Sequence, residues 1–335
     1  MRPPRWKTRN GRSLLVFGAT FLVLVTVGFA GMRLVPGLEF ARQEVPAMGR
    51  PDPSWVPVFF RGGTQLDHTI VWNDIGSAMD HARAADVLFF GTSQMQFGLP
   101  THELRAFERR TGLSAYSLGL PFAEGSVFAR GLIEKFDLRP RVAVVNVTGF
   151  FRDDESLGAS QVRDESYWRA VTTVWEERLA ALAWPVASDV FPSFVTARPS
   201  QTLLRSTTDG TWLPMRWPHF HVPVAEAPEP MRWGTRSAIR FRNALALRGI
   251  ALVLVCVPSP TASCSPEALR PLALLMGAGM VIPKLDTPLW TGDYTHLCPL
   301  SGKRYSRAML RELERVDVVR AIRRRPKPAR AGVRT

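Results

Sequence analysis

An uncharged apolar run occupies residues 13–32, close to the start of the chain. As a helix rising about 1.5 Å per residue, this run matches a hydrocarbon core of about 30 Å. Five basic residues precede the run, and only Arg33 follows it closely. By the positive-inside rule, the sequence predicts a transmembrane anchor with residues 1–12 in the cytoplasm and everything from Pro36 onward outside.

The same run has an alternative interpretation as a cleaved secretory signal peptide. Gly28-Phe29-Ala30 supplies the small residues at positions −3 and −1 of a cleavage site. The run is long for the apolar part of a signal peptide, which favours the anchor. Both interpretations export the rest of the chain to the periplasm or the extracellular side, and no later apolar run is long enough to span a bilayer.

Residues 33–84 are rich in proline and glycine and are interpreted as a linker, after which short apolar strands alternate with amphipathic helices. This alternation predicts an α/β fold, a parallel sheet with helices on both faces, whose ligands bind at the carboxyl ends of the strands. We expect strands over 86–91, 115–118, 142–147, 250–257 and 280–282, and helices over 100–111, 124–136, 237–247, 266–278 and 301–316.

The alternation is interrupted by an insertion over 152–235, which is expected to be mainly helical or irregular. Apolar residues at helical spacing predict a helix within 166–184. Six of the ten tryptophans fall between Trp168 and Trp233. They either bury the insertion against the main domain, which is the commoner use of such residues, or line a groove in which sugar rings stack.

Charge is concentrated at the two ends of the chain. Of the formal net charge of +14, residues 1–12 carry +5 and the stretch from Arg315 to the end carries +7. The middle is close to neutral, which argues against a nucleic-acid-binding face. We therefore divide the chain into an exported domain over 85–316 and a basic tail over 317–335. Residues 320–327 of that tail are either a solvated end or an attractant for an anionic envelope polymer.

Three cysteines exclude a disulfide-dense scaffold and a four-thiolate zinc finger. An exported domain can form disulfides, because its compartment is oxidising. Cys256 lies in an apolar strand pattern and is expected to be a buried thiol. Cys264 and Cys298 lie in loop-like stretches, so a Cys264–Cys298 bridge is expected, with three unpaired thiols as the alternative.

Two short polar stretches follow predicted strands. Ser93 comes directly after the first strand in Gly91-Thr92-Ser93, where the glycine permits a sharp turn. Asp293 and His296 lie three residues apart before the last helix, so the carboxylate can hold one ring nitrogen while the other accepts a proton from a serine. Each stretch alone is weak evidence. Together they predict a Ser93–His296–Asp293 triad at one edge of the sheet.

With these motifs, the chain resembles the SGNH (GDSL-like) hydrolase superfamily over about 86–150 and 237–315. Gly91-Thr92-Ser93 matches the block of the nucleophile, and Asp293 with His296 matches the D-x-x-H block. Gly119 matches the glycine that lends its N–H to the oxyanion hole, together with the N–H of Ser93. The resemblance implies a three-layer, flavodoxin-like fold. It is strongest to the membrane-anchored branch that includes alginate O-acetylation proteins and the D-alanyl transfer protein of teichoic acids.

One block of the superfamily is missing. A G-x-N-D block is expected after the third strand, where its asparagine completes the oxyanion hole, but here Val147 is followed by threonine and glycine. Asn146 lies within the strand and is not expected to substitute. Loss of one oxyanion donor costs about 10²–10³ in rate, which disfavours efficient hydrolysis, while two N–H donors can still support acyl transfer.

The resemblance implies an O-acyltransferase that acts on an envelope or secreted polysaccharide and needs an acyl-exporting membrane protein as partner. The alternatives are an exported esterase of carbohydrate or small esters, and a non-catalytic glycan-binding or assembly protein. No cofactor, metal or nucleic-acid partner is expected. His219 and His221 could face one side of an extended segment as metal ligands do, but no third ligand is evident, and a loop among prolines is the better interpretation.

Overall fold

The computed structural model describes residues 55–58, 60–61, 64–75, 78–121, 124–176, 203–214, 222–224, 232–260 and 264–324. The chain divides into two units, Met1–Ser54 and Trp55–Thr335, of which the first lies wholly outside the described residues. The apolar run over 13–32 belongs to this first unit. His219 and His221 belong to the second unit but also lie outside the described residues. Among the described helices none is both long and apolar enough to cross a membrane.

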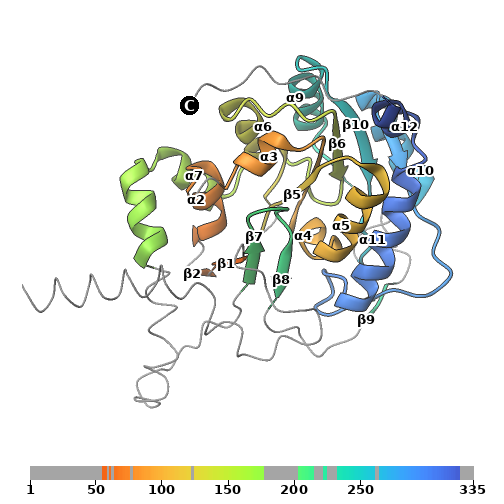
Figure 1. The fold of residues 1–335 in the computed structure, drawn as a ribbon, viewed down its shortest axis with the longest axis horizontal. Coiled ribbons are helices and arrows are strands. Elements are labelled where there is room, and N and C mark those ends of the chain that lie inside the picture. The colour runs from red at the N-terminus through yellow and green to blue at the C-terminus, as the bar shows by residue number, and fades with distance from the viewer. Residues whose placement is uncertain are drawn as a thin grey trace, which may run out of the picture. The chain divides into compact units, whose positions relative to one another are not determined.

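A five-stranded parallel sheet forms the centre of the second unit (Figure 1). Its strand order is β11-β10-β6-β4-β5, and every neighbouring pair is parallel. The α/β class and the parallel sheet predicted from the alternating pattern are confirmed. The strands are β4 (Val87–Gly91), β5 (Ala115–Gly119), β6 (Val142–Asn146), β10 (Ala251–Val255) and β11 (Gly279–Val281).

Helices cover both faces of this sheet, because successive strand residues point to opposite sides. Leu88 and Phe90 of β4 pack into one apolar cluster, and Val87 and Phe89 pack into the other. The first cluster is closed by α6 (Ser126–Lys135), α9 (Thr235–Ala246) and α10 (Pro266–Met276). The second is closed by α4 (Ser93–Gly98), α5 (Thr101–Thr111), α11 (Pro299–Leu313) and α12 (Asp317–Arg324).

The start of the predicted basic tail belongs to the folded body. Residues 317–324 form α12, and its Val319 is fully buried in the second cluster. The basic side chains of Arg323 and Arg324 fall in the last turn of this helix, where they complement the carbonyl end.

The expected linker and the insertion meet in a second, antiparallel sheet of order β1-β7-β8. Its strands are β1 (Trp55–Val58), β7 (Leu203–Ser206) and β8 (Trp212–Pro214). Two smaller pairs join β2 (Phe60–Arg61) to β3 (Thr64–Gln65) and β9 (Val222–Pro223) to β12 (Trp290–Thr291). The segments also contribute α2 (Leu66–Trp72), α3 (Asp80–Ala84), α7 (Leu157–Asp164) and a helix that includes 167–176. The insertion thus contains strands as well as the helical and irregular parts expected.

A buried ion pair ties α2 to β7. Asp67 is fully buried and accepts a hydrogen bond from Arg205, which is 4% exposed. Arg205 also donates to the backbone oxygen of Ser117 in β5, at 3.3 Å. The pair therefore connects the second sheet to the edge strand of the first.

The tryptophans of the insertion do not share one environment. Trp212 is 4% exposed and packs with Ile70 and Val174 in a third apolar cluster, whereas Trp168 is 76% exposed. Trp233 packs, partly buried, against the cluster that covers the first face of the main sheet. Two of these three residues therefore serve packing, and Trp184 and Trp217 lie outside the described residues.

Candidate active site

Ser93 is placed by a tight passage from β4 into α4. The strand ends at Gly91, where a Cβ atom would lie 2.6 Å from the Cβ of Met95 and 2.9 Å from that of Asn146. Only glycine fits there, because real Cβ contacts are not this short. Thr92 is the extended N-cap residue, and Ser93 is the first residue of α4. Its hydroxyl is partly exposed at the carboxyl edge of the sheet, where parallel folds bind ligands.

Asp293 and His296 lie in a short loop between β12 and α11. The loop closes through hydrogen bonds from Gly292 N to His296 O and from Cys298 N to Trp290 O, both 2.9 Å. Asp293 Oδ1 accepts from the backbone N–H of His296 at 2.7 Å, which fixes the carboxylate within the turn. The same oxygen accepts from the N–H of Thr295 at 3.1 Å, and this bond forms an Asx turn, which aspartate and asparagine favour.

The structure brings the three predicted side chains into one chain of hydrogen bonds. His296 Nε2 lies 2.7 Å from Ser93 Oγ, and His296 Nδ1 lies 2.6 Å from Asp293 Oδ2. The imidazole is 17% exposed and the carboxylate 38% exposed. A carboxylate that holds one ring nitrogen leaves the other to accept the proton of the serine hydroxyl, which is the geometry of an activated nucleophile.

The electrostatics of the loop favour a charged carboxylate. Partial burial raises the pKa of Asp293, but hydrogen bonds from the ring and backbone of His296, the charge of the imidazole and the N–H of Thr295 together lower it below its ordinary value of 3.8. Asp293 is thus ionised at neutral pH and can stabilise an imidazolium on His296.

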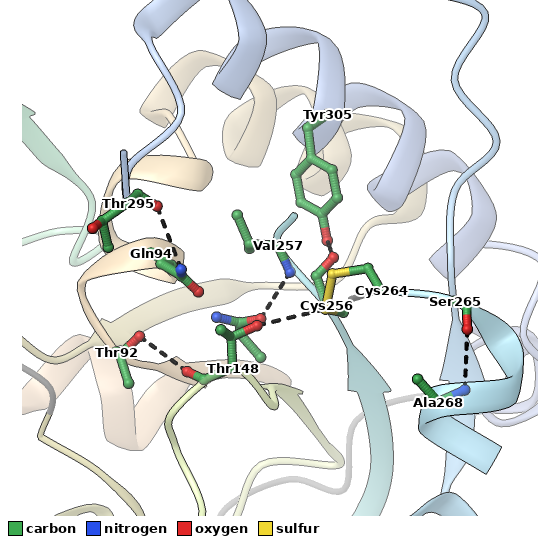
Figure 2. The surroundings of a disulfide bond; sticks show 11 residues. Thr92, Gln94, Thr148, Cys256, Val257, Cys264, Ser265, Ala268, Thr295 and Tyr305 are labelled. Atoms are coloured by element: carbon green, nitrogen blue, oxygen red, sulfur yellow. Dashed lines mark hydrogen bonds between the residues drawn. A yellow bond between two sulfur atoms is a disulfide. The ribbon is translucent and has the colours of Figure 1, made fainter. Parts of the chain in front are cut away.

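Two neighbours of Ser93 on α4 hold the histidine loop and were not singled out by the sequence. The ring of Phe97 meets the His296 ring edge-to-face, with centroids 4.8 Å apart. Gln94 Nε2 donates to the backbone oxygen of Thr295 at 3.4 Å (Figure 2). No sequence signal points to them, because both contacts depend on where the distant histidine loop packs against α4.

Gly119, the second expected oxyanion donor, ends β5 beside Gly91 of β4. A Cβ atom at Gly119 would lie 2.7 Å from the backbone nitrogen of Gln96, so α4 packs directly on this glycine. The N–H of Gly119 donates to Ser117 Oγ at 3.4 Å, a long and easily exchanged bond. The N–H of Ser93 has no partner among the described residues.

Asn146 is the last residue of β6 and precedes the turn in which the missing asparagine was expected. Its Oδ1 accepts a hydrogen bond from the N–H of Val257 at 2.8 Å, which holds the chain after β10. Its Nδ2 is buried without a partner. In the turn that follows, Thr148 contributes its carbonyl to a hydrogen bond from Thr92 Oγ1 (3.3 Å; Figure 2).

The expected Cys264–Cys298 bridge is wrong. The disulfide joins Cys256 to Cys264, with Cα atoms 5.5 Å apart (Figure 2). Cys256 directly follows β10, and the chain returns to this point within eight residues. Cys298 is a buried free thiol at the N-cap of α11, with Sγ 3.3 Å from Ser301 Oγ. The bridge pins the loop after β10 beside the turn after β6, where Thr148 Oγ1 lies 3.5 Å from Cys256 Sγ.

Among the described residues, no group of three histidine, cysteine, aspartate or glutamate side chains is placed to hold a metal ion. No family model, curated protein or solved structure matches the chain.

Proposed function

We propose that this chain is an exported, membrane-anchored O-acyltransferase of SGNH type that acts on an envelope or secreted polysaccharide. The observation that carries the proposal is the unbroken hydrogen-bond chain from Ser93 through His296 to Asp293, with links of 2.7 and 2.6 Å. Ser93 and His296 come from segments two hundred residues apart, and such a convergence at the ligand-binding edge of a parallel sheet favours a reaction site.

In the first half-reaction, Ser93 Oγ attacks the carbonyl carbon of an acyl donor and its proton moves to His296 Nε2. The N–H groups of Ser93 and Gly119 donate to the oxyanion of the tetrahedral intermediate. As the intermediate collapses, the bond to the leaving group breaks, and His296 returns the proton to that group. The acyl group is then an ester of Ser93.

In the second half-reaction, a sugar hydroxyl transfers its proton to His296 and attacks the acyl carbon. The bond to Ser93 Oγ breaks, the serine regains a proton from His296, and the acyl group leaves on the sugar. Acetyl is the acyl group that we expect. If water takes the place of the sugar, the same steps make an esterase.

Two features support export. The apolar run over 13–32, with its basic N-terminal flank, has the length and charge asymmetry of a membrane anchor. The disulfide between Cys256 and Cys264 suits an oxidising compartment. Because acyl-CoA is cytoplasmic, an exported transferase needs a membrane protein that delivers the acyl group.

A fluorophosphonate probe tests whether Ser93 is a nucleophile. We expect the full chain to be labelled and Ser93→Ala and His296→Ala not to be, with the free energy of unfolding of each variant within about 1 kcal/mol of the original. Ser160→Ala, in the exposed part of α7, is the matched control and should label fully. An unlabelled original chain that still binds polysaccharide would leave the non-catalytic alternative.

Turnover of p-nitrophenyl acetate separates transferase from esterase. A transferase releases nitrophenol slowly alone and faster with an oligosaccharide acceptor, and the acetyl group appears on the sugar. Turnover that does not change with acceptor, and releases only free acetate, would favour the esterase.

A further inference from the structure

A small cavity of about 70 Å³ lies between the N-terminal ends of α6 and α9, which pack against each other. It is lined by Ser126, Val127, Arg130, Asp153, Ser237, Arg240 and Phe241. A cavity of this size holds a few waters or one small polyatomic group. Figure 1 shows the two helices side by side on one face of the main sheet.

Three hydrogen-bond donors at the start of α6 lack partners among the described residues, while the N–H of Ser126 donates to Phe150 O at 2.8 Å. Gly125, the N-cap residue of α6, offers no side-chain cap, and its first turn has no acidic residue. The N–H groups of Val127 and Phe128 have no acceptor among the described residues. Ser126 is 2% exposed, and its hydroxyl is buried without a partner. Burying an unpaired hydroxyl costs free energy, so this arrangement indicates a ligand that accepts these bonds.

The charge around the cavity is positive on balance. Arg130 and Arg240 line it from the two helices. Arg240 has no ion pair among the described residues, and Arg130 Nε is 3.5 Å from exposed Glu134. The one acidic side chain in the lining, Asp153, accepts a hydrogen bond from Ser237 N at 3.0 Å, so the N-terminus of α9 offsets part of its negative charge. Helix N-termini and guanidinium groups both attract anions.

We propose that this cavity is a binding site for a small oxyanion, namely a phosphate, sulfate or carboxylate group. The N–H groups of Val127 and Phe128 and the Ser126 hydroxyl donate to its oxygens, and Arg130 and Arg240 neutralise its charge. The site does not depend on the reaction proposed for Ser93. Because helices that alternate with parallel strands begin at the carboxyl ends of those strands, it lies at the same edge of the sheet as Ser93.

Titration calorimetry of the full chain at constant ionic strength tests this site, with inorganic phosphate, sulfate and glucuronate as probes. We expect saturable binding of at least one probe. Arg240→Gln should weaken it by about tenfold, since it removes a charge-assisted bond, and Ser126→Ala should weaken it by a smaller factor. Tighter binding of glucuronate identifies the carboxylate of an acidic sugar as the ligand, and tighter binding of phosphate or sulfate identifies an inorganic ion or its ester.

Arg311→Gln is the matched control, because Arg311 is exposed on α11, which covers the opposite face of the sheet. It removes the same charge and should leave binding within about twofold. Thermal unfolding without probe should not fall to lower temperature in Ser126→Ala, because the substitution removes a buried hydroxyl that makes no bond in the protein alone. The proposal is overturned if no probe binds saturably, if Arg311→Gln weakens binding as much as Arg240→Gln, or if Ser126→Ala leaves binding unchanged.

Discussion

Replacing Gly119 with alanine is expected to slow the reaction of Ser93 without touching any group of the triad. The added Cβ would lie 2.7 Å from the backbone nitrogen of Gln96 and 2.8 Å from its Cα atom. Both contacts are with helix backbone, which cannot rotate away as the end of a flexible side chain does. The helix concerned is α4, which begins with Ser93.

The size of the displacement sets the size of the effect. Ordinary van der Waals contact begins at 3.4 Å, so α4 or the end of β5 must move by about 0.7 Å. A misplacement of about 1 Å costs about 10²-fold in rate, so we expect a loss of about ten- to a hundredfold. Overpacking of this kind also lowers the free energy of unfolding by about 1–3 kcal/mol. Alanine keeps the backbone N–H, so the loss does not come from a missing oxyanion donor.

The rate of labelling by a fluorophosphonate is the assay, because it reports the reactivity of Ser93 whatever the natural acyl group is. Thermal unfolding is followed in parallel. Gly279→Ala is the matched control, since a Cβ in that strand of the same sheet would meet its nearest neighbours at 3.6 Å, an ordinary contact. If Gly119→Ala labels within twofold of the original chain, the close packing of α4 on β5 does not position the nucleophile.

Three further predictions concern charge and bonding elsewhere. Asp293→Asn should lower turnover by about 10⁴. Because the pKa of Asp293 is depressed in the folded state, its carboxylate stabilises the original chain above about pH 4, and this contribution is lost as the pH falls further. Unfolding curves measured against pH should show this loss in the original chain and not in the variant. Arg205→Met should lower the free energy of unfolding in urea by about 3–5 kcal/mol, because it leaves Asp67 buried and unpaired. Adding Asp67→Leu should recover most of this loss. A loss below about 1 kcal/mol would mean that the charge of Asp67 is not buried. Denatured, unreduced protein should show one reactive thiol, whereas three would contradict the Cys256–Cys264 bond.

The central sheet could be predicted from the sequence because its strands are short, continuous apolar runs flanked by helices. Such runs are typical of strands that are buried on both faces, as β4 and β6 are. The polar residues after these strands then became the candidates for chemistry. The meeting of Ser93 with His296 followed from topology together with the family resemblance, and the catalytic roles of both remain predictions.

The remaining features depend on pairings that no local pattern encodes. β1 pairs with a strand whose residues lie some hundred and fifty positions away, and both are too short to show a period. The choice between disulfide partners depends on where the chain turns after β10, which the spacing of Cys256, Cys264 and Cys298 does not specify. The contact of Phe97 with His296 needs the direction of a side chain, which a sequence pattern does not supply.

The pairing of β1 with β7 determines where the chain can be cut to make a soluble fragment. A fragment that starts at 85, where the alternating pattern begins, would lose the strand that covers one side of β7 and also the carboxylate of Asp67 that neutralises Arg205. The bared strand would offer unpaired backbone groups to other molecules, a recognised route to aggregation. A fragment that begins before Trp55 keeps both partners, and crystallisation or binding trials are best started from it.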